Sequence, residues 1–393
     1  MQTTAWITST MGVGAVIAAL IAVSIWLEKR FRSLAFLGSA ILVITGGAVL
    51  ANLHIIPSAL VADKETMHPV YAFANDVAVP LSIVLLLISA DLKSVRLLGR
   101  SSLIAFGLAS VGTVLGTLLA IQLTAGGIGP ESWKLAGQFV ASYIGGGINY
   151  AAVGEALETS ETMYATGAAA DNIMTNLWMV ATAVLPPLLR AWYPSYNSGG
   201  ADESITRAQQ RKQVAGISLG QMGLLLAVAF LVVWIGDGLA PMVNEALKVN
   251  IPAVLWYTTL AILLSLFTPL SQVRGGMELG HYLLHFFFAT MGAGTILSSL
   301  VDKGPIVFLF LVILVAIHAL IVFGLGKVLK LEVEMLAIAS QATVGGPSTA
   351  LALATAKRWD RLVAPGVLMG LLGYAIGNYV GIGVGTLVKA WLG

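Results

Sequence analysis

The sequence contains no cysteine and few charged residues, and both shortages exclude whole classes of protein. Without cysteine, the chain forms no disulfides and no thiolate metal sites, and it has no cysteine nucleophile. Asp, Glu, Lys and Arg make up 10% of the 393 residues, whereas soluble domains carry about 25%. Hydrophobic residues make up 58%, and the net charge of +2 is too small to suggest binding to nucleic acid. We therefore expect an all-α membrane protein. It would contact the lipid bilayer and would not bind nucleic acid.

Long apolar segments fill most of the chain, and a bilayer takes about 20 such residues for each crossing. Six lie in each half, and the polar stretch 190–213 between the halves predicts a cytoplasmic linker. The first segment lacks the basic start of a signal peptide, so we expect it to be retained. The expected segments are 5–27, 33–53, 75–92, 102–123, 136–157, 162–189, 214–235, 252–270, 281–300, 305–328, 335–356 and 363–391.

The two halves are similar in sequence around their glycine-rich segments. With an offset of 199 residues, Gly146-Gly147 aligns with Gly345-Gly346, and Gly167 aligns with Gly366 without a gap. Glycine-interrupted apolar segments at matching places in two halves are typical of secondary transporters. We therefore expect two repeats, 1–189 and 214–393.

The lysines and arginines of the loops predict how the chain crosses the membrane, because they concentrate on the cytoplasmic side. If every segment crosses, these residues are divided almost evenly between the two sides. If 136–157 and 335–356 are re-entrant hairpins, most lie on one side, and the outer side keeps only Lys64, Lys134, Lys248, Lys303 and Lys389. We therefore expect five spans and one hairpin per half, the second half inverted, in the inner (plasma) membrane with the N-terminus outside.

The two expected hairpins carry the polar residues best placed to bind a solute. Unwound backbone is tolerated inside a membrane where it is buried in protein or lines a wet cavity. A broken helix offers free carbonyl groups to Na⁺ and a helix N-terminus to an anion. The alternative is that the glycines only allow close helix packing. The expected solute-binding residues are Gly146, Gly147, Asn149, Tyr150, Gly345, Gly346, Ser348 and Thr349.

An acidic residue, Asp171, lies near the middle of the segment 162–189. Charge at that depth is costly and indicates function, and a carboxylate beside amides suits Na⁺ or a proton. The alternative is a protonated Asp171 that only bonds neighbouring helices. The second half has Gly370 at the corresponding place, so we expect one acidic site and no metal beyond Na⁺. The expected ion-binding residues are Asp171, Asn172, Thr175, Asn176, Gln341 and Thr343.

Other polar residues in the apolar segments give weaker signals. Glu155 on the returning arm of the first hairpin either faces water or takes part in the site. Asn378 suits helix bonding as well as ligand contact, and His318 suits a bonded packing residue. His281 and His285 are four residues apart but lack the carboxylate of the zinc-peptidase pattern. We expect no catalytic residue and no cofactor, because no phosphate loop, nucleotide fingerprint or Ser/His/Asp spacing is present.

At these motifs the chain resembles a known family. The stretches FVASYIGGGINYAAVGEAL, ATGAAADNIMTNLW and ASQATVGGPSTALALA are similar to the YjcL-like family of bacterial and chloroplast membrane proteins. More distantly, the paired glycine hairpins resemble those of sodium/glutamate symporters and 2-hydroxycarboxylate transporters, which belong with the cation/proton antiporter-like folds. Unlike the glutamate carriers, the chain has Ile148-Asn149-Tyr150 at one hairpin tip and no mid-membrane arginine.

The resemblance implies an elevator mechanism, in which a core slides against a scaffold that also forms a homodimer. The scaffold would comprise 5–53 and 214–270, and the core 75–189 and 281–391. The function expected is secondary active transport, a Na⁺- or H⁺-coupled symport of a small organic anion. The alternative is a cation/proton antiporter without an organic substrate, and neither would be an enzyme.

Overall fold

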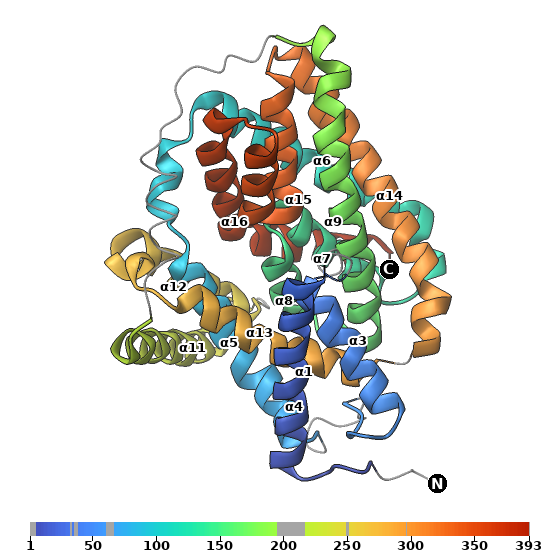
Figure 1. Ribbon diagram of the computed structural model, residues 1–393, viewed down its shortest axis with the longest axis vertical. Coiled ribbons are helices and arrows are strands. Elements are labelled where there is room, and N and C mark those ends of the chain that lie inside the picture. The colour runs from blue at the N-terminus through green and yellow to red at the C-terminus, as the bar shows by residue number, and fades with distance from the viewer. Residues whose placement is uncertain are drawn as a thin grey trace.

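The computed structural model describes residues 5–31, 34, 38–59, 67–194, 217–248, 251–295 and 297–392, and these form helices without any strand (Figure 1). The linker expected at 190–213 lies outside the described residues after Pro194. The first half contains α1 Thr10–Arg30, α3 Gly38–Asn52, α4 Pro69–Phe73, the π-helical turn η2 Ala74–Ala78, α5 Val79–Ser89, η3 Leu92–Leu97, α6 Arg100–Ile128, α7 Ser132–Gly145, α8 Gly147–Ala156, α9 Glu161–Leu189 and η4 Arg190–Trp192. The second contains α11 Leu219–Leu247, α12 Ala253–Phe267, η5 Pro269–Gln272, α13 Gly276–Ala293, α14 Leu297–Val328, α15 Val333–Ala356 and α16 Asp360–Leu392. The expected all-α fold is confirmed.

Seven of the described helices are long and apolar enough to cross a membrane. They are α1, the continuous helix Pro69–Ser89, α6, α9 with η4, α11, α14 from Asp302, and α16. Of the other three expected spans, α3 and α12 are apolar but have 15 residues each. The third, α13, carries Glu278, His281 and His285 and is not among the seven.

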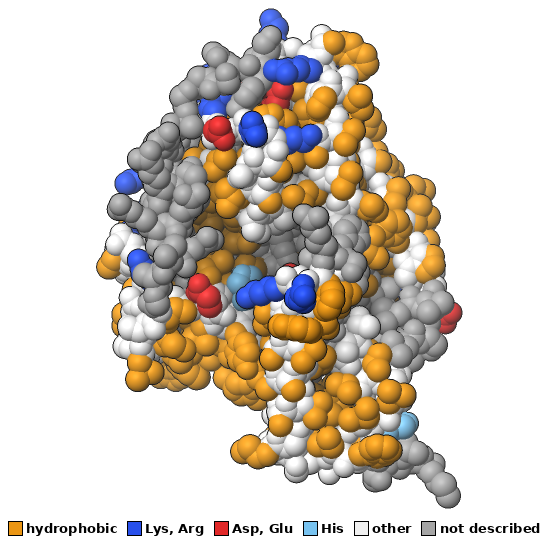
Figure 2. Space-filling model, in the orientation of Figure 1, with side chains coloured by type: hydrophobic (Ala, Val, Ile, Leu, Met, Phe, Trp, Pro, Cys, Tyr) orange, Lys and Arg blue, Asp and Glu red, His pale blue; other side chains and the backbone are white. Residues whose placement is uncertain are grey.

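The outer surface of the helices is apolar, as contact with lipid requires. Leu123 on α6, Trp234 on α11 and Leu320 on α14 are 66%, 73% and 68% exposed. Figure 2 shows hydrophobic side chains over the flank that α6 and α14 form. A soluble protein rarely exposes so much contiguous apolar surface, so the chain is a multi-pass membrane protein.

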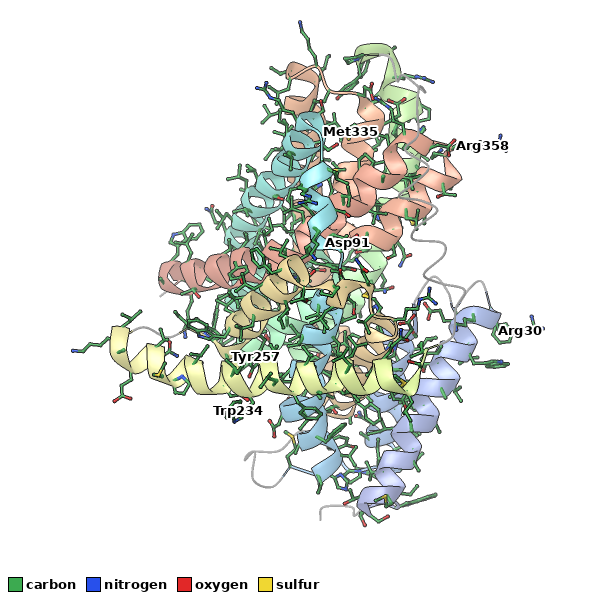
Figure 3. All side chains as sticks on the ribbon, turned by 90° about the vertical axis from the view of Figure 1, so that its left-hand side faces the viewer. Arg30, Asp91, Trp234, Tyr257, Met335 and Arg358 are labelled. Atoms are coloured by element: carbon green, nitrogen blue, oxygen red, sulfur yellow. The ribbon has the colours of Figure 1, made fainter. Side chains whose placement is uncertain are left out.

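The helices form two bundles, which lie in the lower and upper parts of Figure 1. The outer bundle contains α1, α3, α4, α5, α11, α12 and α13, and the hairpin bundle contains α6, α7, α8, α9, α14, α15 and α16. In the outer bundle α3 packs on α13, and α12 packs on α5. In the hairpin bundle α6 packs along α14, α7 on α16, and α15 on α9. Figure 3 shows α11 lying crosswise to α1.

Glycines allow the closest of these helix contacts. A Cβ added at Gly116 on α6 would lie 2.5 Å from the carbonyl oxygen of Leu314 on α14. A Cβ added at Gly47 on α3 would lie 2.6 Å from the carbonyl oxygen of Ala289 on α13. Membrane helices lack a hydrophobic force between them, so close backbone packing at small residues is what holds them together.

Candidate functional site

The segment expected as the first hairpin folds back on itself at Gly146, between α7 and α8. Gly146 has φ 87°, a left-handed conformation that glycine adopts without strain. The side-chain amide of Gln138 on α7 donates to the carbonyl oxygen of Tyr150 on α8 at 3.4 Å. A Cβ added at Gly154 would lie 2.4 Å from the Gln138 nitrogen, so the two arms lie side by side only because Gly154 has no side chain.

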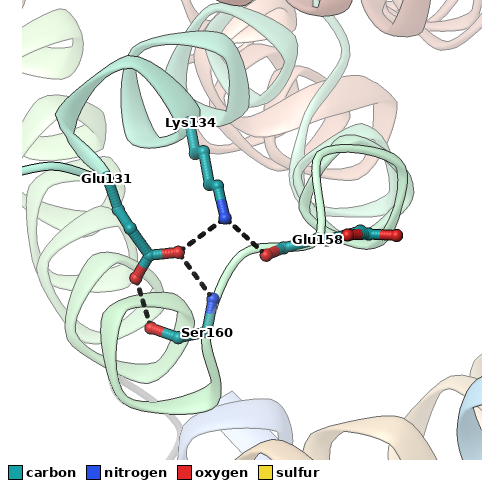
Figure 4. A network of polar contacts seen from close by, with 4 residues as sticks. All are labelled: Glu131, Lys134, Glu158 and Ser160. Atoms are coloured by element: carbon teal, nitrogen blue, oxygen red, sulfur yellow. Dashed lines mark hydrogen bonds and ion pairs between the residues drawn. The ribbon is translucent and has the colours of Figure 1, made fainter.

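A polar network closes the base of this first hairpin (Figure 4). Lys134 donates to Glu131 Oε1 at 2.8 Å and to the carbonyl oxygen of Glu158 at 2.7 Å. Both the amide and the hydroxyl of Ser160 donate to the Glu131 carboxylate. Burial acts to raise the pKa of Glu131, but these hydrogen bonds and the charge of Lys134 outweigh it, and the pKa lies below its ordinary value.

The segment expected as the second hairpin has the same construction. α15 is broken at Gly346, where φ is 78° and ψ is −171°, close to the values at Gly146. Arg361 at the start of α16 forms an ion pair with Glu332, the N-cap of α15. These partners are 29 residues apart, as are the partners that close the first hairpin. In each segment, therefore, a polar contact holds the first and last residues together, as in a hairpin.

The two hairpins touch at their tips. A Cβ added at Gly146 would lie 3.6 Å from the Cα of Gly346, so the two backbones meet without intervening side chains. A Cβ added at either glycine would lie 3.6 Å or less from the ring of Tyr374 on α16, which covers both. By backbone conformation and position Gly346 matches Gly146, whereas the sequence alignment placed Gly345 opposite Gly146.

The expected solute-binding residues divide between exposed and inward-facing positions. Gly147 and Ser348 are exposed beside the tips. The Thr349 hydroxyl lies 3.1 Å from the carbonyl oxygen of Gly346 and 3.3 Å from that of Gln341, so it stabilises the break in its own hairpin. The buried Tyr150 is turned away from the tips and donates to the carbonyl oxygen of Tyr164 on α9.

Asn149 connects the first hairpin tip to the rest of the molecule. Its side-chain nitrogen donates to the carbonyl oxygen of Tyr374 at 3.1 Å and to Asn378 Oδ1 at 2.8 Å. The Asn378 nitrogen donates in turn to the Thr258 hydroxyl on α12, at 2.8 Å. Asn149 Oδ1 is buried and has no hydrogen-bond partner among the described residues. Hydrogen bonds thus run from the tip through the side chains of Asn149 and Asn378 to Thr258 of the outer bundle. Within the described part of the chain, Asn149 Oδ1 remains available as an acceptor.

Asp171 lies against the first hairpin. The Ser142 hydroxyl on α7 donates to Asp171 Oδ2 at 2.9 Å. The Tyr143 hydroxyl lies beside the same carboxyl group and near Thr175, although neither it nor Asp171 Oδ1 has a partner of regular geometry among the described residues. Oxygen ligands of this kind suit a hard cation. Sequence analysis missed Ser142 and Tyr143, whose only signal was their place one turn before the break.

The other expected ion-binding residues are placed elsewhere. Asn176 donates to the backbone and side-chain oxygens of Asn172, and a Cβ added at Gly38 would lie 3.5 Å from Asn172 Nδ2, on the side of the outer bundle. In the second hairpin, Gln341 Oε1 accepts from Thr182 at 3.1 Å. Thr343 donates to its neighbour, the carbonyl oxygen of Ser340, at 2.8 Å. Of the expected ion-binding residues, only Thr175 therefore lies beside Asp171. Asn172, Asn176, Gln341 and Thr343 form hydrogen bonds with other groups.

A buried polar column joins the two hairpins. His318 on α14 lies 3.0 Å from the Thr113 hydroxyl on α6 through Nδ1 and 2.7 Å from the Ser340 hydroxyl through Nε2. Thr113 donates to the carbonyl oxygen of Tyr143, and Trp178 Nε1 donates to Ser340. His318 is fully buried, as expected for a bonded packing residue. It contacts Ser340 of the second hairpin directly and Tyr143 of the first hairpin through Thr113, a link that the sequence did not indicate.

A cavity of about 830 Å³ lies between the two bundles, beside the base of the first hairpin. Lys134 is bonded to Glu131, and Lys389 lies 4.6 Å above the ring of Trp133. Carboxylates outnumber these lysines in the lining, so the cavity attracts cations. The charged lining residues are Asp76, Asp237, Glu155, Glu158, Lys134 and Lys389.

These features define a multi-pass α-helical membrane protein with two opposed hairpins at its centre. Residues 15–391 match the family described as "Protein of unknown function (DUF819)", and the chain belongs to that family. The chain is 32% identical over 400 residues to the "Uncharacterized membrane protein YjcL" of Bacillus subtilis (strain 168), with 96% of each chain covered. The YjcL-like resemblance expected from the motifs is thereby confirmed.

Proposed function

We propose that the protein is a secondary active transporter that couples Na⁺ or H⁺ to the symport of a small organic anion. The observation that carries this proposal is the contact of Gly146 with Gly346, where two broken helices meet inside one bundle. Broken helices at matching positions of two repeats are the usual site of solute and ion binding in such transporters. The protein would not be an enzyme and would need no cofactor beyond Na⁺.

The packing of the helices supports an inverted repeat. In an inverted repeat, α3 would correspond to α12, α5 to α13, α6 to α14, α7 to α15, and α9 to α16. The contact of α3 with α13 then becomes that of α12 with α5, and the contact of α7 with α16 becomes that of α15 with α9. Both members of each pair are present, as a twofold relation between the halves requires.

The division into two bundles supports an elevator mechanism. The hairpin bundle would move as the core and carry both hairpin tips, and the outer bundle would stay as the scaffold and form the homodimer. By this packing α5 and α13 belong with the scaffold, whereas the resemblance placed 75–92 and 281–300 in the core. The cavity between the bundles would be the route from the outer side to the tips.

Two neighbouring sites would share the binding. The N-termini of α8 and of the second arm of α15 point their free amides at the tips, where they would hold the anionic group of the solute beside Gly147 and Ser348. Asp171, Ser142, Tyr143 and Thr175 would hold the cation. We further propose the inner (plasma) membrane, with the N-terminus outside and the linker 190–213 in the cytoplasm.

A cation/proton antiporter without an organic solute is the second candidate, and the acidic cavity favours it. An acidic entrance concentrates cations and repels an anionic solute. The antiporter would use Asp171 in the same way, with Na⁺ and H⁺ competing for one carboxylate.

Flux measurements in proteoliposomes separate the two functions. Under symport, a Na⁺ or H⁺ gradient drives uptake of a radiolabelled anion found by a stability screen, because a ligand of the folded state raises its melting temperature. Under antiport, a Na⁺ gradient alone drives proton movement, reported by an enclosed pH dye. Absence of both fluxes in protein that binds neither Na⁺ nor any anion of the screen would contradict both proposals.

A further inference from the structure

The hydrogen bonds of the His318 column run in one direction. Trp178 donates to the Ser340 hydroxyl, which can donate only onward to His318 Nε2. Thr113 gives its one proton to the carbonyl oxygen of Tyr143, so it must accept from His318 Nδ1. A neutral imidazole protonated on Nδ1 satisfies every member at once, and the tautomer follows from this network.

The two ends of the column lie at the two proposed binding sites. Tyr143 is the neighbour of Ser142, which bonds Asp171. Ser340 precedes Gln341, whose backbone carbonyl oxygen lies 3.3 Å from the Thr349 hydroxyl at the break of the second hairpin. The column is therefore a continuous path of hydrogen bonds and adjoining residues from the cation site to the other hairpin.

Close packing leaves the column little room to adjust. A Cβ added at Gly112, next to Thr113 on α6, would lie 3.1 Å from the Cα of His318. One turn further on, Gly116 is held equally close to Leu314 of α14. Because α6 and α14 are in backbone contact on this face, a shift of the Tyr143 carbonyl cannot be absorbed by a small movement of these two helices.

We propose that His318 is a positioning residue that couples cation binding at Asp171 to the conformation of the second hairpin. This rests on the proposed function. A cation bound by Asp171, Ser142 and Tyr143 displaces the first hairpin slightly, and the column transmits the displacement to Ser340. Solute binding at the second tip then depends on cation binding at the first, which is the coupling that symport requires.

The absence of cysteine from the chain allows a direct test. Ser348 is exposed at the second tip, so S348C supplies a single thiol for a maleimide reagent. We expect saturating Na⁺ to change the labelling rate by about fivefold or more, the lower range of measured coupling between sites. In T113V the column is broken, and we expect the labelling rate to become independent of Na⁺ while Na⁺ still raises the melting temperature.

A matched control lies one turn along the same helix. Thr117 is fully buried, and its hydroxyl has no hydrogen-bond partner among the described residues. T117V should therefore keep the full Na⁺ effect on S348C labelling. H318F should lose the effect as T113V does, whereas H318Q, which can both donate and accept, should retain part of it.

The outcomes distinguish this inference from the proposed function. A Na⁺ effect on S348C labelling that survives in T113V and H318F would overturn the inference. So would the lack of any effect in protein that Na⁺ stabilises. If neither Na⁺ nor a change of pH alters the stability of the unsubstituted protein, the cation site itself is wrong, and the coupling is wrong with it.

Discussion

The side-chain nitrogen of Asn149 donates a 2.8 Å hydrogen bond to Oδ1 of Asn378. Asn149 lies at a hairpin tip, and Asn378 donates in turn to Thr258 of the outer bundle. All three side chains are at most 1% exposed. This pair therefore connects the proposed moving part of the molecule to its proposed stationary part.

Replacing Asn378 with Leu should weaken this connection and lower stability by about 1 kcal/mol, the usual size of such bonds between membrane helices. The reason is that Asn149 keeps one acceptor, the Tyr374 carbonyl, and loses the other. Thermal unfolding in detergent gives the measurement. Y379F is the control. It removes the more exposed hydrogen bond between Tyr379 on α16 and Thr259 on α12, the two helices that Asn378 and Thr258 also join. Equal losses in both variants would contradict the importance of the Asn149 connection.

Gly116→Ala should destabilise the protein strongly, by about 1–3 kcal/mol or more, as overpacking does. The added methyl group would meet the Leu314 carbonyl oxygen at 2.5 Å, and backbone does not move aside. G107A on the same helix is the matched control, because its Cβ meets nothing within 4 Å. Alanine is the better helix former, so propensity alone would raise both melting temperatures. Equal falls in the two variants would contradict the role of the contact between α6 and α14.

The network at the base of the first hairpin should make stability depend on pH. Glu131 has a pKa below its ordinary value of 4.5 because of its partners, so its stabilisation is present above pH 4.5 and is lost as the pH falls through the lower, folded-state pKa. E131Q should therefore melt below the unsubstituted protein at pH 7, and the difference should shrink under acid. In E158Q the backbone acceptor of Lys134 remains, so a similar pH-dependent difference there would contradict the role of Glu131.

Asp171→Asn should abolish stabilisation by Na⁺. A ligand at 100 times its dissociation constant stabilises the folded state by about 2.7 kcal/mol, and the neutral amide should lose that gain. S142A should weaken Na⁺ binding, because Ser142 contacts the carboxylate. N172A should leave it unchanged, since Asn172 is bonded to Asn176 instead. Loss of Na⁺ binding in N172A would restore the ion site expected from sequence.

The acidic cavity should raise the local cation concentration at low salt. D76N combined with E158Q removes two lining charges. The double variant should need more Na⁺ for half-maximal stabilisation at about 10 mM ionic strength, and the difference should vanish near 1 M, where charges are screened within about 3 Å. A shift that persists at high salt would indicate direct cation binding in the cavity.

The sequence predicted the helical fold and the two broken segments because both follow from local chemistry. Apolar runs form helices in lipid, and the clusters Gly145-Gly146-Gly147 and Gly345-Gly346-Pro347 are local signals for a break. The sequence also predicted a role for Asp171, because an acidic residue in the middle of a membrane segment is costly and therefore rare. The ends of the hairpins were less predictable, because Glu332 finds Arg361 only after the chain has folded.

The surroundings of Asp171 depend on tertiary packing and could not be predicted. Spacing along α9 suggested Asn172 and Asn176 as its neighbours, but Asn172 lies near Gly38 of the outer bundle and Asn176 bonds to Asn172. Ser142 and Tyr143 reach Asp171 from another helix. In the same way, only the approach of α6 to α14 brings Thr113 to His318, and no pattern within either helix reports it.

The position of the two helix breaks has a further consequence. Gly146 follows Glu131 by fifteen residues, whereas Gly346 follows Glu332 by fourteen, although both closed segments span 29 residues. One residue along a helix is about 1.5 Å of rise and about 100° of rotation. The two tips therefore present unlike faces across their contact. A small molecule held between them would experience a polar, handed environment, and it would bind in one orientation and as one mirror-image form.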